Sequence, residues 1–198
     1  MLKKMYDKCV EWAGHKFANP ILAFIAFLES FIFPIPTDAM LIPMVIAKRI
    51  DYLKIFLVAT FASALGGLFG YFLGSFFFDL ATNLIQFYGY EKQVLSLKND
   101  LSAGNGLFFF MGTLFLAGFT PLPFKVFTIT SGIIGLNIFI FFLICLLSRG
   151  LRFFVVSYLS FKFGLKFNNF MEKDANKFFT IVGLIIVAIA GTLYFIIK

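Results

Sequence analysis

The feature that most restricts the fold is a Pro-x-Pro step that ends an apolar run too short to cross a membrane. Residues 20–34 reach only about 22 Å as a helix, against a hydrocarbon core roughly 30 Å thick. Pro34-Ile35-Pro36 ends the run, because each proline lacks an N–H and restricts the residue before it. A second short arm, residues 37–47, follows at once. We therefore predict a re-entrant hairpin whose tip is held against protein or water.

The same pattern occurs a second time further along the chain. Residues 107–120 form another short apolar arm, Pro121-Leu122-Pro123 breaks it, and residues 124–134 form the return arm. The sequence therefore predicts a second re-entrant hairpin with Pro121 and Pro123 at its tip.

A long apolar run follows each hairpin, over residues 53–75 and about 136–160, and each is long enough to span a membrane. Each unit then crosses the bilayer once, so repeat one (20–75) and repeat two (107–160) must have opposite orientations. This is the inverted-repeat plan of many transporters, whose site lies near mid-membrane. The first long run also carries glycines at every fourth position, which predicts close packing of another helix: Gly66, Gly70 and Gly74.

The composition places the whole chain in a membrane. Hydrophobic residues make up 61% and charged residues 14% of the chain, whereas soluble domains carry about 25% charged residues. Residues 1–19 show an amphipathic pattern that fits an interfacial helix, and residues 178–197 form a final uncharged span. We expect an all-α integral membrane protein with a single membrane domain, residues 20–198.

The distribution of lysine and arginine predicts the topology. The segment plan puts eleven of the seventeen bases on the side of the N-terminus, three on the other side and three within the membrane. Cytoplasmic loops carry such an excess, so we expect a multi-pass inner-membrane protein with its N-terminus in the cytoplasm and its C-terminus outside. The net charge of +7 is thereby explained without a nucleic-acid partner.

Five ionisable residues remain at membrane depth: Glu29, Asp38, Lys125, Arg149 and Arg152. Each unpaired charge there would cost at least about 2.5–3.5 kcal/mol. Hairpins that enter from opposite faces bring their tips together, so we expect acids of repeat one to meet bases of repeat two. The two arginines are three residues apart and share a helical face.

These charges support two interpretations. Their formal sum is +1, which an anionic ligand would balance, and two guanidiniums suit the geometry of a phosphate. Alternatively, the charges form internal salt bridges that only pin the hairpins. The sequence holds no Ser/His/Asp set, nucleotide-binding loop or metal-ligand cluster, so we expect neither an enzyme nor a cofactor or metal.

Three stretches of the chain resemble one known family. They are residues 29–38 (ESFIFPIPTD), residues 118–125 (GFTPLPFK) and residues 149–153 (RGLRF). They are similar to the conserved blocks of the DedA family, also called the VTT or SNARE-associated Golgi protein domain, and in particular to its short bacterial YqaA-like branch. The resemblance covers about residues 15–197, and two Pro-x-Pro blocks at this separation are fairly specific.

The resemblance implies movement of lipids across a bacterial inner membrane. Family members recycle polyprenyl-phosphate carriers, flip phosphatidylethanolamine or scramble phospholipids. The embedded acids and arginines are the family's functional residues, and they correspond here to Glu29, Asp38, Arg149 and Arg152. This chain departs from many members in having Thr37-Asp38 where they have a glutamate, and Lys125 where they have an arginine. A lysine lacks the bidentate fork of an arginine.

We therefore expect a lipid flippase or scramblase-like transporter of a phosphate-bearing lipid. Arg149, Arg152 and Lys125 are the predicted substrate-binding residues, and Glu29 and Asp38 are predicted to pair with them or to carry a coupled proton. The alternative is a non-transporting scaffold or homeostasis factor pinned by the same charges. A third alternative is a lipid-modifying enzyme, which would need a metal or a nucleophile that we do not find in the sequence. A homo-oligomer is left open.

Overall fold

The structure is a computed structural model, and every element it describes is a helix. These are α2 (Ala18–Glu29), α3 (Asp38–Ala47), the 3-10 helix η1 (Arg49–Asp51), α4 (Tyr52–Phe87), α6 (Gly104–Phe119), α7 (Phe124–Ile134) and α8 (Ile138–Phe163). The residues described are 12–13, 15–31, 37–87, 99, 104–120, 122–164, 177, 180–181 and 183–185.

Several predicted features fall outside these residues. Pro34, Pro36 and Pro121 are among them, as are most of the expected interfacial helix, residues 1–19, and most of the expected final span, residues 178–197. Of the predicted tip prolines, the structure therefore describes Pro123, which is the residue that precedes α7.

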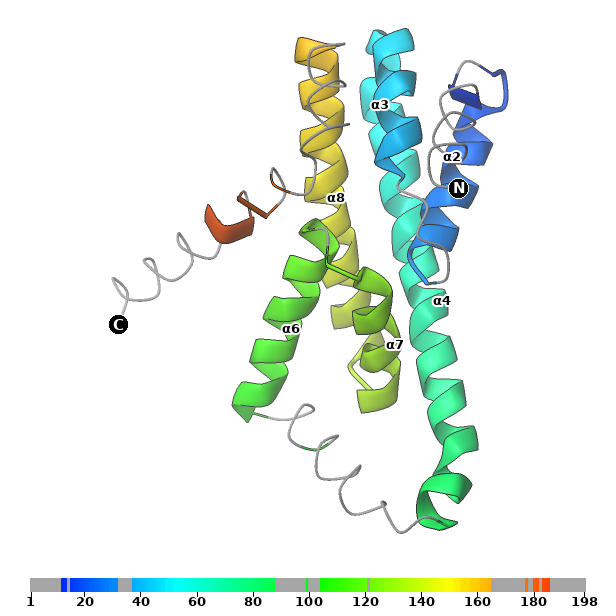
Figure 1. The fold of residues 1–198 in the computed structure, drawn as a ribbon, viewed down its shortest axis with the longest axis vertical. Helices are drawn as coiled ribbons and strands as arrows, with labels where there is room; N and C mark the ends of the chain where they lie inside the picture. Colours follow the sequence, from blue (N-terminus) through cyan, green and yellow to red (C-terminus); the bar gives the residue numbers. More distant parts are fainter. Residues whose placement is uncertain are drawn as a thin grey trace.

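The short helices form two hairpins that point toward each other along two long helices (Figure 1). In the view of Figure 1, α2 runs downward and α3 returns upward, whereas α6 runs upward and α7 returns downward. The long helices α4 and α8 run in opposite directions and pack against each other. α4 also packs against α2 and α7, and α8 packs against α3 and α6. Each hairpin is thereby attached to both long helices.

Two helices are long and apolar enough to cross a membrane, Arg49–Phe78 with 30 residues and Ile138–Phe163 with 26. At 1.5 Å per residue each exceeds the roughly 30 Å of a hydrocarbon core. The helices of the hairpins have 10 to 16 residues, so each is about 15–24 Å long and falls short of it. The predicted contrast between short arms and long helices is confirmed in the described residues.

The first long helix extends further than the sequence pattern suggested. The predicted apolar run ends at Ser75, but α4 continues to Phe87. No proline or glycine lies between residues 76 and 87, so nothing in the backbone stops the helix there. Loss of hydrophobicity alone does not end a helix.

A tight connection joins α7 to α8. Gly135 ends α7 with φ +70°, in the left-handed region where a side chain would be strained. The Asn137 side chain then caps α8 by accepting hydrogen bonds from the backbone N–H groups of Phe139 and Ile140, at 3.0 and 3.3 Å. These two residues set the return angle between hairpin and long helix.

The predicted glycine face of α4 is confirmed. A Cβ atom at Gly66 would overlap the carbonyl oxygen of Phe27 in α2, and one at Gly74 would overlap the carbonyl oxygen of Ile129 in α7. At Gly70 it would come within 2.6 Å of the Thr128 hydroxyl. The glycines therefore let the backbones of both hairpins approach α4 closely.

This close approach predicts opposite effects at two adjacent glycines. Gly66→Ala should lower the free energy of unfolding by about 1–3 kcal/mol, because backbone atoms cannot yield to the added methyl group. Gly67→Ala should be neutral or slightly stabilising, since its Cβ would lie at an ordinary 3.6 Å from the nearest atom and alanine favours helix. Thermal unfolding in detergent measures both, and equal melting temperatures for the two variants would contradict the packing.

Candidate functional site

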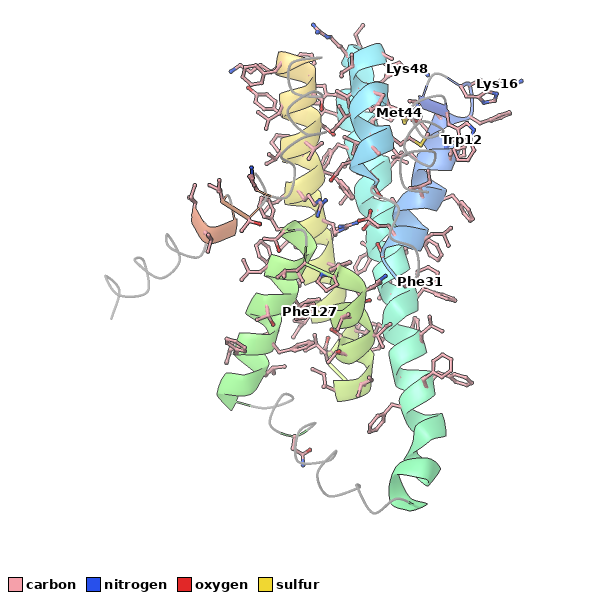
Figure 2. The ribbon with its side chains drawn as sticks, viewed as in Figure 1. Trp12, Lys16, Phe31, Met44, Lys48 and Phe127 are labelled. Atoms are coloured by element: carbon pink, nitrogen blue, oxygen red, sulfur yellow. The ribbon has the colours of Figure 1, made fainter. Side chains whose placement is uncertain are left out.

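The buried charges lie level with the middle of α8 and with the middle of the candidate span Arg49–Phe78, which contains most of α4. Arg149 and Arg152 are close to the middle of α8, and Ser63 is close to the middle of the candidate span Arg49–Phe78. The inner ends of the short helices approach the same level, where Phe31 is labelled (Figure 2). Four short helices therefore direct their ends at one buried layer.

Arg149 is held in a fixed position by groups from two other helices. It is only 1% exposed. Its Nε donates to Ser63 Oγ of α4 at 2.7 Å, and its Nη2 lies 3.0 Å from Glu29 Oε2 at the end of α2. A guanidinium cannot lose its charge under ordinary conditions, so this buried cation requires the carboxylate.

Aromatic rings cover the Arg149 guanidinium. Its central carbon lies 5.1 Å from the ring centroid of Phe124 in α7 and 4.8 Å from that of Phe153 in α8. A cation at such distances is attracted to the ring and is also shielded from solvent. Phe124 belongs to the second hairpin, so both hairpins take part in holding Arg149.

Glu29 is placed by the end of α2 and the start of α3. It is the last residue of α2, and its carboxylate accepts hydrogen bonds from the hydroxyl and the backbone N–H of Thr37, the latter at 3.3 Å. The C-terminal end of a helix carries partial negative charge, and here that end adds to the carboxylate opposite Arg149. The break between the two arms thus serves to orient an acid.

Arg152 joins the same layer one turn further along α8. Its Nη2 donates to Asp38 Oδ2 at 2.6 Å, and its Nη1 donates to the Thr120 carbonyl oxygen at 3.1 Å. Asp38 is the first residue of α3, where a negative charge is favoured by the helix dipole. Thr120 follows α6, so Arg152 connects the tips of the two hairpins.

The expectation that acids of the first repeat meet bases of the second is confirmed. Glu29 pairs with Arg149, and Asp38 pairs with Arg152. Lys125 lies in the first turn of α7 and is half-buried. Among the described residues, no three His, Cys, Asp or Glu side chains gather as a metal site.

Hydroxyl groups complete the layer, and sequence reasoning did not single them out. Ser63 Oγ lies 2.8 Å from Ser30 Oγ, and both side chains are fully buried. Thr37 and Thr120 supply further contacts to Glu29 and Arg152. A signal did exist for Ser63, because it continues the glycine face of α4 three residues before Gly66.

The Asp38–Arg152 ion pair predicts strong coupling between these residues. Asp38→Asn and Arg152→Gln should each lower the free energy of unfolding by about 3–5 kcal/mol, because each removes the ion-pair partner of a buried charge. The double variant should lose clearly less than the sum, which denaturant unfolding in detergent would measure.

A matched cycle provides the control. Lys162 is exposed near the end of α8, about 15 Å along the axis from Arg152. Asp38→Asn combined with Lys162→Gln should be additive within about 0.5 kcal/mol. The pairing would be contradicted if the Asp38 and Arg152 substitutions were equally additive.

Comparison with known proteins finds that the chain is similar to two bacterial proteins. It is 36% identical over 194 residues to an uncharacterized protein of Haemophilus influenzae, a match that covers 98% of this chain and 96% of the relative. It is likewise 36% identical over 194 residues to an uncharacterized protein of Histophilus somni, with 98% and 97% covered. No family model and no solved structure gives a significant match. The chain therefore belongs to the same family as these two proteins.

Proposed function

We propose that this chain is a flippase or scramblase-like transporter that moves a phosphate-bearing lipid, such as a polyprenyl phosphate or a phospholipid, across the bacterial inner membrane. The observation that carries the proposal is the pair of arginine–carboxylate contacts buried halfway along two helices of membrane-spanning length. Charged side chains at that depth are costly and mark functional pathways. The three DedA-like stretches of sequence support the same assignment.

The two faces of α4 favour a lipid environment. Its exposed side carries large apolar residues, and its buried side carries mostly small ones, the reverse of a helix in water. The exposed set is Leu53, Leu57, Phe61, Leu65, Phe69, Phe72 and Phe76. The buried set is Ile55, Ala59, Thr60, Ser63, Ala64, Gly66, Gly67, Gly70 and Gly74. In α8 five charged or hydroxyl-bearing side chains are likewise buried, Ser148, Arg149, Arg152, Ser157 and Ser160, whereas Tyr158 and Lys162 are exposed.

In this proposal the two hairpins are re-entrant and form an inverted repeat. They point in opposite directions in the fold (Figure 1), and their helices are too short to span. Lys16 and Lys48 lie at one end of the molecule, beyond the open end of the first hairpin (Figure 2). Cytoplasmic surfaces favour such bases, so the N-terminus is assigned to the cytoplasm and the C-terminus to the outside.

A lipid phosphate suits the chemistry of the layer. Guanidinium groups bind phosphate oxygens bidentately, and a lipid can bring a phosphate to mid-membrane while its chains stay in hydrocarbon. Arg149 and Arg152 are the proposed contacts, with Lys125 as an additional point charge at the second hairpin. The lipid would exchange with the carboxylates as partner of the arginines during translocation.

Proton coupling is a secondary part of the proposal. Asp38 Oδ1 is buried and accepts no hydrogen bond from a described residue, which leaves that oxygen available to a proton. Glu29 is the other candidate, because loss of its charge would remove the ion-pair partner of Arg149. Protonation of either acid would release an arginine toward an anionic lipid.

A second candidate function is a non-transporting membrane scaffold. The contact between Arg152 and the Thr120 carbonyl oxygen favours it, because this bond ties α8 to the second hairpin without any ligand. In a scaffold the buried pairs would serve only to hold the hairpins in place. The two functions differ in whether the arginines are needed for lipid movement once the protein is folded.

The re-entrant topology predicts which positions face the same side. In a background with both native cysteines replaced by alanine, Lys16→Cys and Lys48→Cys should both react with an impermeant maleimide from the cytoplasmic side. Asn105→Cys and Asn137→Cys should both react from outside. Reaction of the first two positions from opposite sides would rule out the re-entrant first hairpin.

The proposed phosphate contact predicts a loss of transport in Arg152→Lys. The lysine keeps the charge but lacks the fork, so lipid translocation should fall about ten- to hundredfold, since a hydrogen bond to a charged group is worth about 1.5–3 kcal/mol. Arg152→Gln should lose both transport and stability. Translocation of fluorescent lipids in vesicles, over a panel of head groups, and thermal unfolding in detergent measure the two effects.

The matched control is Arg49→Lys, the same substitution at an exposed position outside the layer. It should leave transport and stability unchanged. Wild-type rates in Arg152→Lys would reject the bidentate contact, and a wild-type protein that moves none of the lipids would favour the scaffold.

A further inference from the structure

A chain of hydroxyl groups joins three helices at the buried layer. It begins at Arg149 Nε in α8, passes through Ser63 Oγ in α4 and Ser30 Oγ after α2, and ends at the Ala26 carbonyl oxygen. The successive distances are 2.7, 2.8 and 3.0 Å. Ser30, Ser63 and Arg149 are all at most 1% exposed.

The direction of every hydrogen bond in this chain follows from the number of protons. Arg149 Nε can only donate, so Ser63 Oγ accepts from it. Ser30 uses its one proton to donate to the Ala26 carbonyl oxygen. Ser30 Oγ is then the acceptor in the bond between the two serines, and Ser63 is its donor. The chain thus runs one way, from the cation to a helix carbonyl, and its members polarise one another.

The geometry at the end of α2 leaves a carbonyl oxygen free to accept the last hydrogen bond of this series. The backbone N–H of Ser30 bonds to the Phe27 carbonyl oxygen, which lies three residues back rather than four. The last turn of α2 is therefore tightened, and the Ala26 carbonyl oxygen receives the serine hydroxyl instead. The turn that ends the first arm thereby provides the last acceptor of the chain.

We propose that Ser63, supported by Ser30, is a positioning residue that fixes the direction of the Arg149 guanidinium. The rings of Phe124 and Phe153 limit the tilt of its plane, and the bond from Nε to Ser63 sets its rotation within that plane. One terminal nitrogen, Nη2, is thereby held 3.0 Å from Glu29 Oε2 as an ion pair. The effect on transport rests on the proposed function, since the terminal nitrogens would bind the lipid phosphate.

A fixed guanidinium needs no reorganisation when an anion arrives. Without Ser63, the buried Nε would lose its acceptor and the side chain would populate other orientations. We expect Ser63→Ala to raise the lipid concentration for half-maximal translocation about tenfold while the maximal rate changes little. Ser30→Ala leaves Ser63 in place as acceptor, so it should raise that concentration only a few-fold.

The direct test is the Nε–H signal of Arg149 in protein labelled with 15N-arginine, assigned by its absence in Arg149→Lys. The signal should move strongly in Ser63→Ala, move less in Ser30→Ala in the same direction, and stay in place in Ser160→Ala. Ser160 is the matched control, because it is a buried serine of α8 that donates to Val156 of its own helix.

The spectrum tests the hydrogen-bond chain to Arg149, and the transport assay tests the effect of that chain on lipid translocation. An Arg149 signal unchanged in both Ser63→Ala and Ser30→Ala would contradict the hydrogen-bond chain from Arg149 to Ser30. A shifted signal with unchanged lipid dependence would show that Ser63 has only a structural role, which also overturns the proposal. If the wild-type protein moved no lipid, the proposed function would fail while the spectrum still decided the chain. If Ser63→Ala did not fold, Ser30→Ala would carry both measurements.

Discussion

Burial of two permanently charged guanidinium groups is the constraint on which the rest of the structure depends. Removing a charge from water costs several kcal/mol even after relaxation, unless a partner and further hydrogen bonds compensate it. Arg149 and Arg152 each have a carboxylate and a neutral oxygen within hydrogen-bonding distance. Those partners come from α2, α3, α4 and the end of α6, so the layer can form only when both hairpins are in place.

In the proposed membrane orientation, the broken arms explain how acids can reach the middle of the bilayer. A continuous helix would place its ends, with their unsatisfied backbone groups and dipoles, at the surfaces of the bilayer. An arm that stops halfway brings its end to the middle, where Glu29 and Asp38 stand at the end of α2 and the start of α3. The glycines of α4 let the hairpins approach closely enough for these side chains to meet the arginines of α8.

Much of this arrangement could be predicted from the sequence because it depends on strong local signals. Prolines interrupt the apolar runs, run length separates the two helices that are long enough to span a membrane from the shorter ones, and the five charged residues stand out in apolar surroundings. The pairing of Asp38 with Arg152, and the contacts of Ser30 and Ser63, could not be predicted, because they depend on side-chain rotation. Serine is common in helices, and only the fold distinguishes Ser63 from Ser160. The extension of α4 to Phe87 could not be predicted from the apolar run, because loss of hydrophobicity does not by itself end a helix.

The scaffold and the transporter would contain the same ion pairs. A charge swap distinguishes between the two functions. The double variant Asp38→Arg, Arg152→Asp keeps a pair between α3 and α8 while moving the cation away from Arg149. Translocation of a fluorescent phospholipid by the folded variant in vesicles is the measurement. Our account predicts restored thermal stability relative to either single variant but transport near that of protein-free vesicles. Wild-type transport by the swapped pair would contradict the claim that these arginines hold the lipid phosphate.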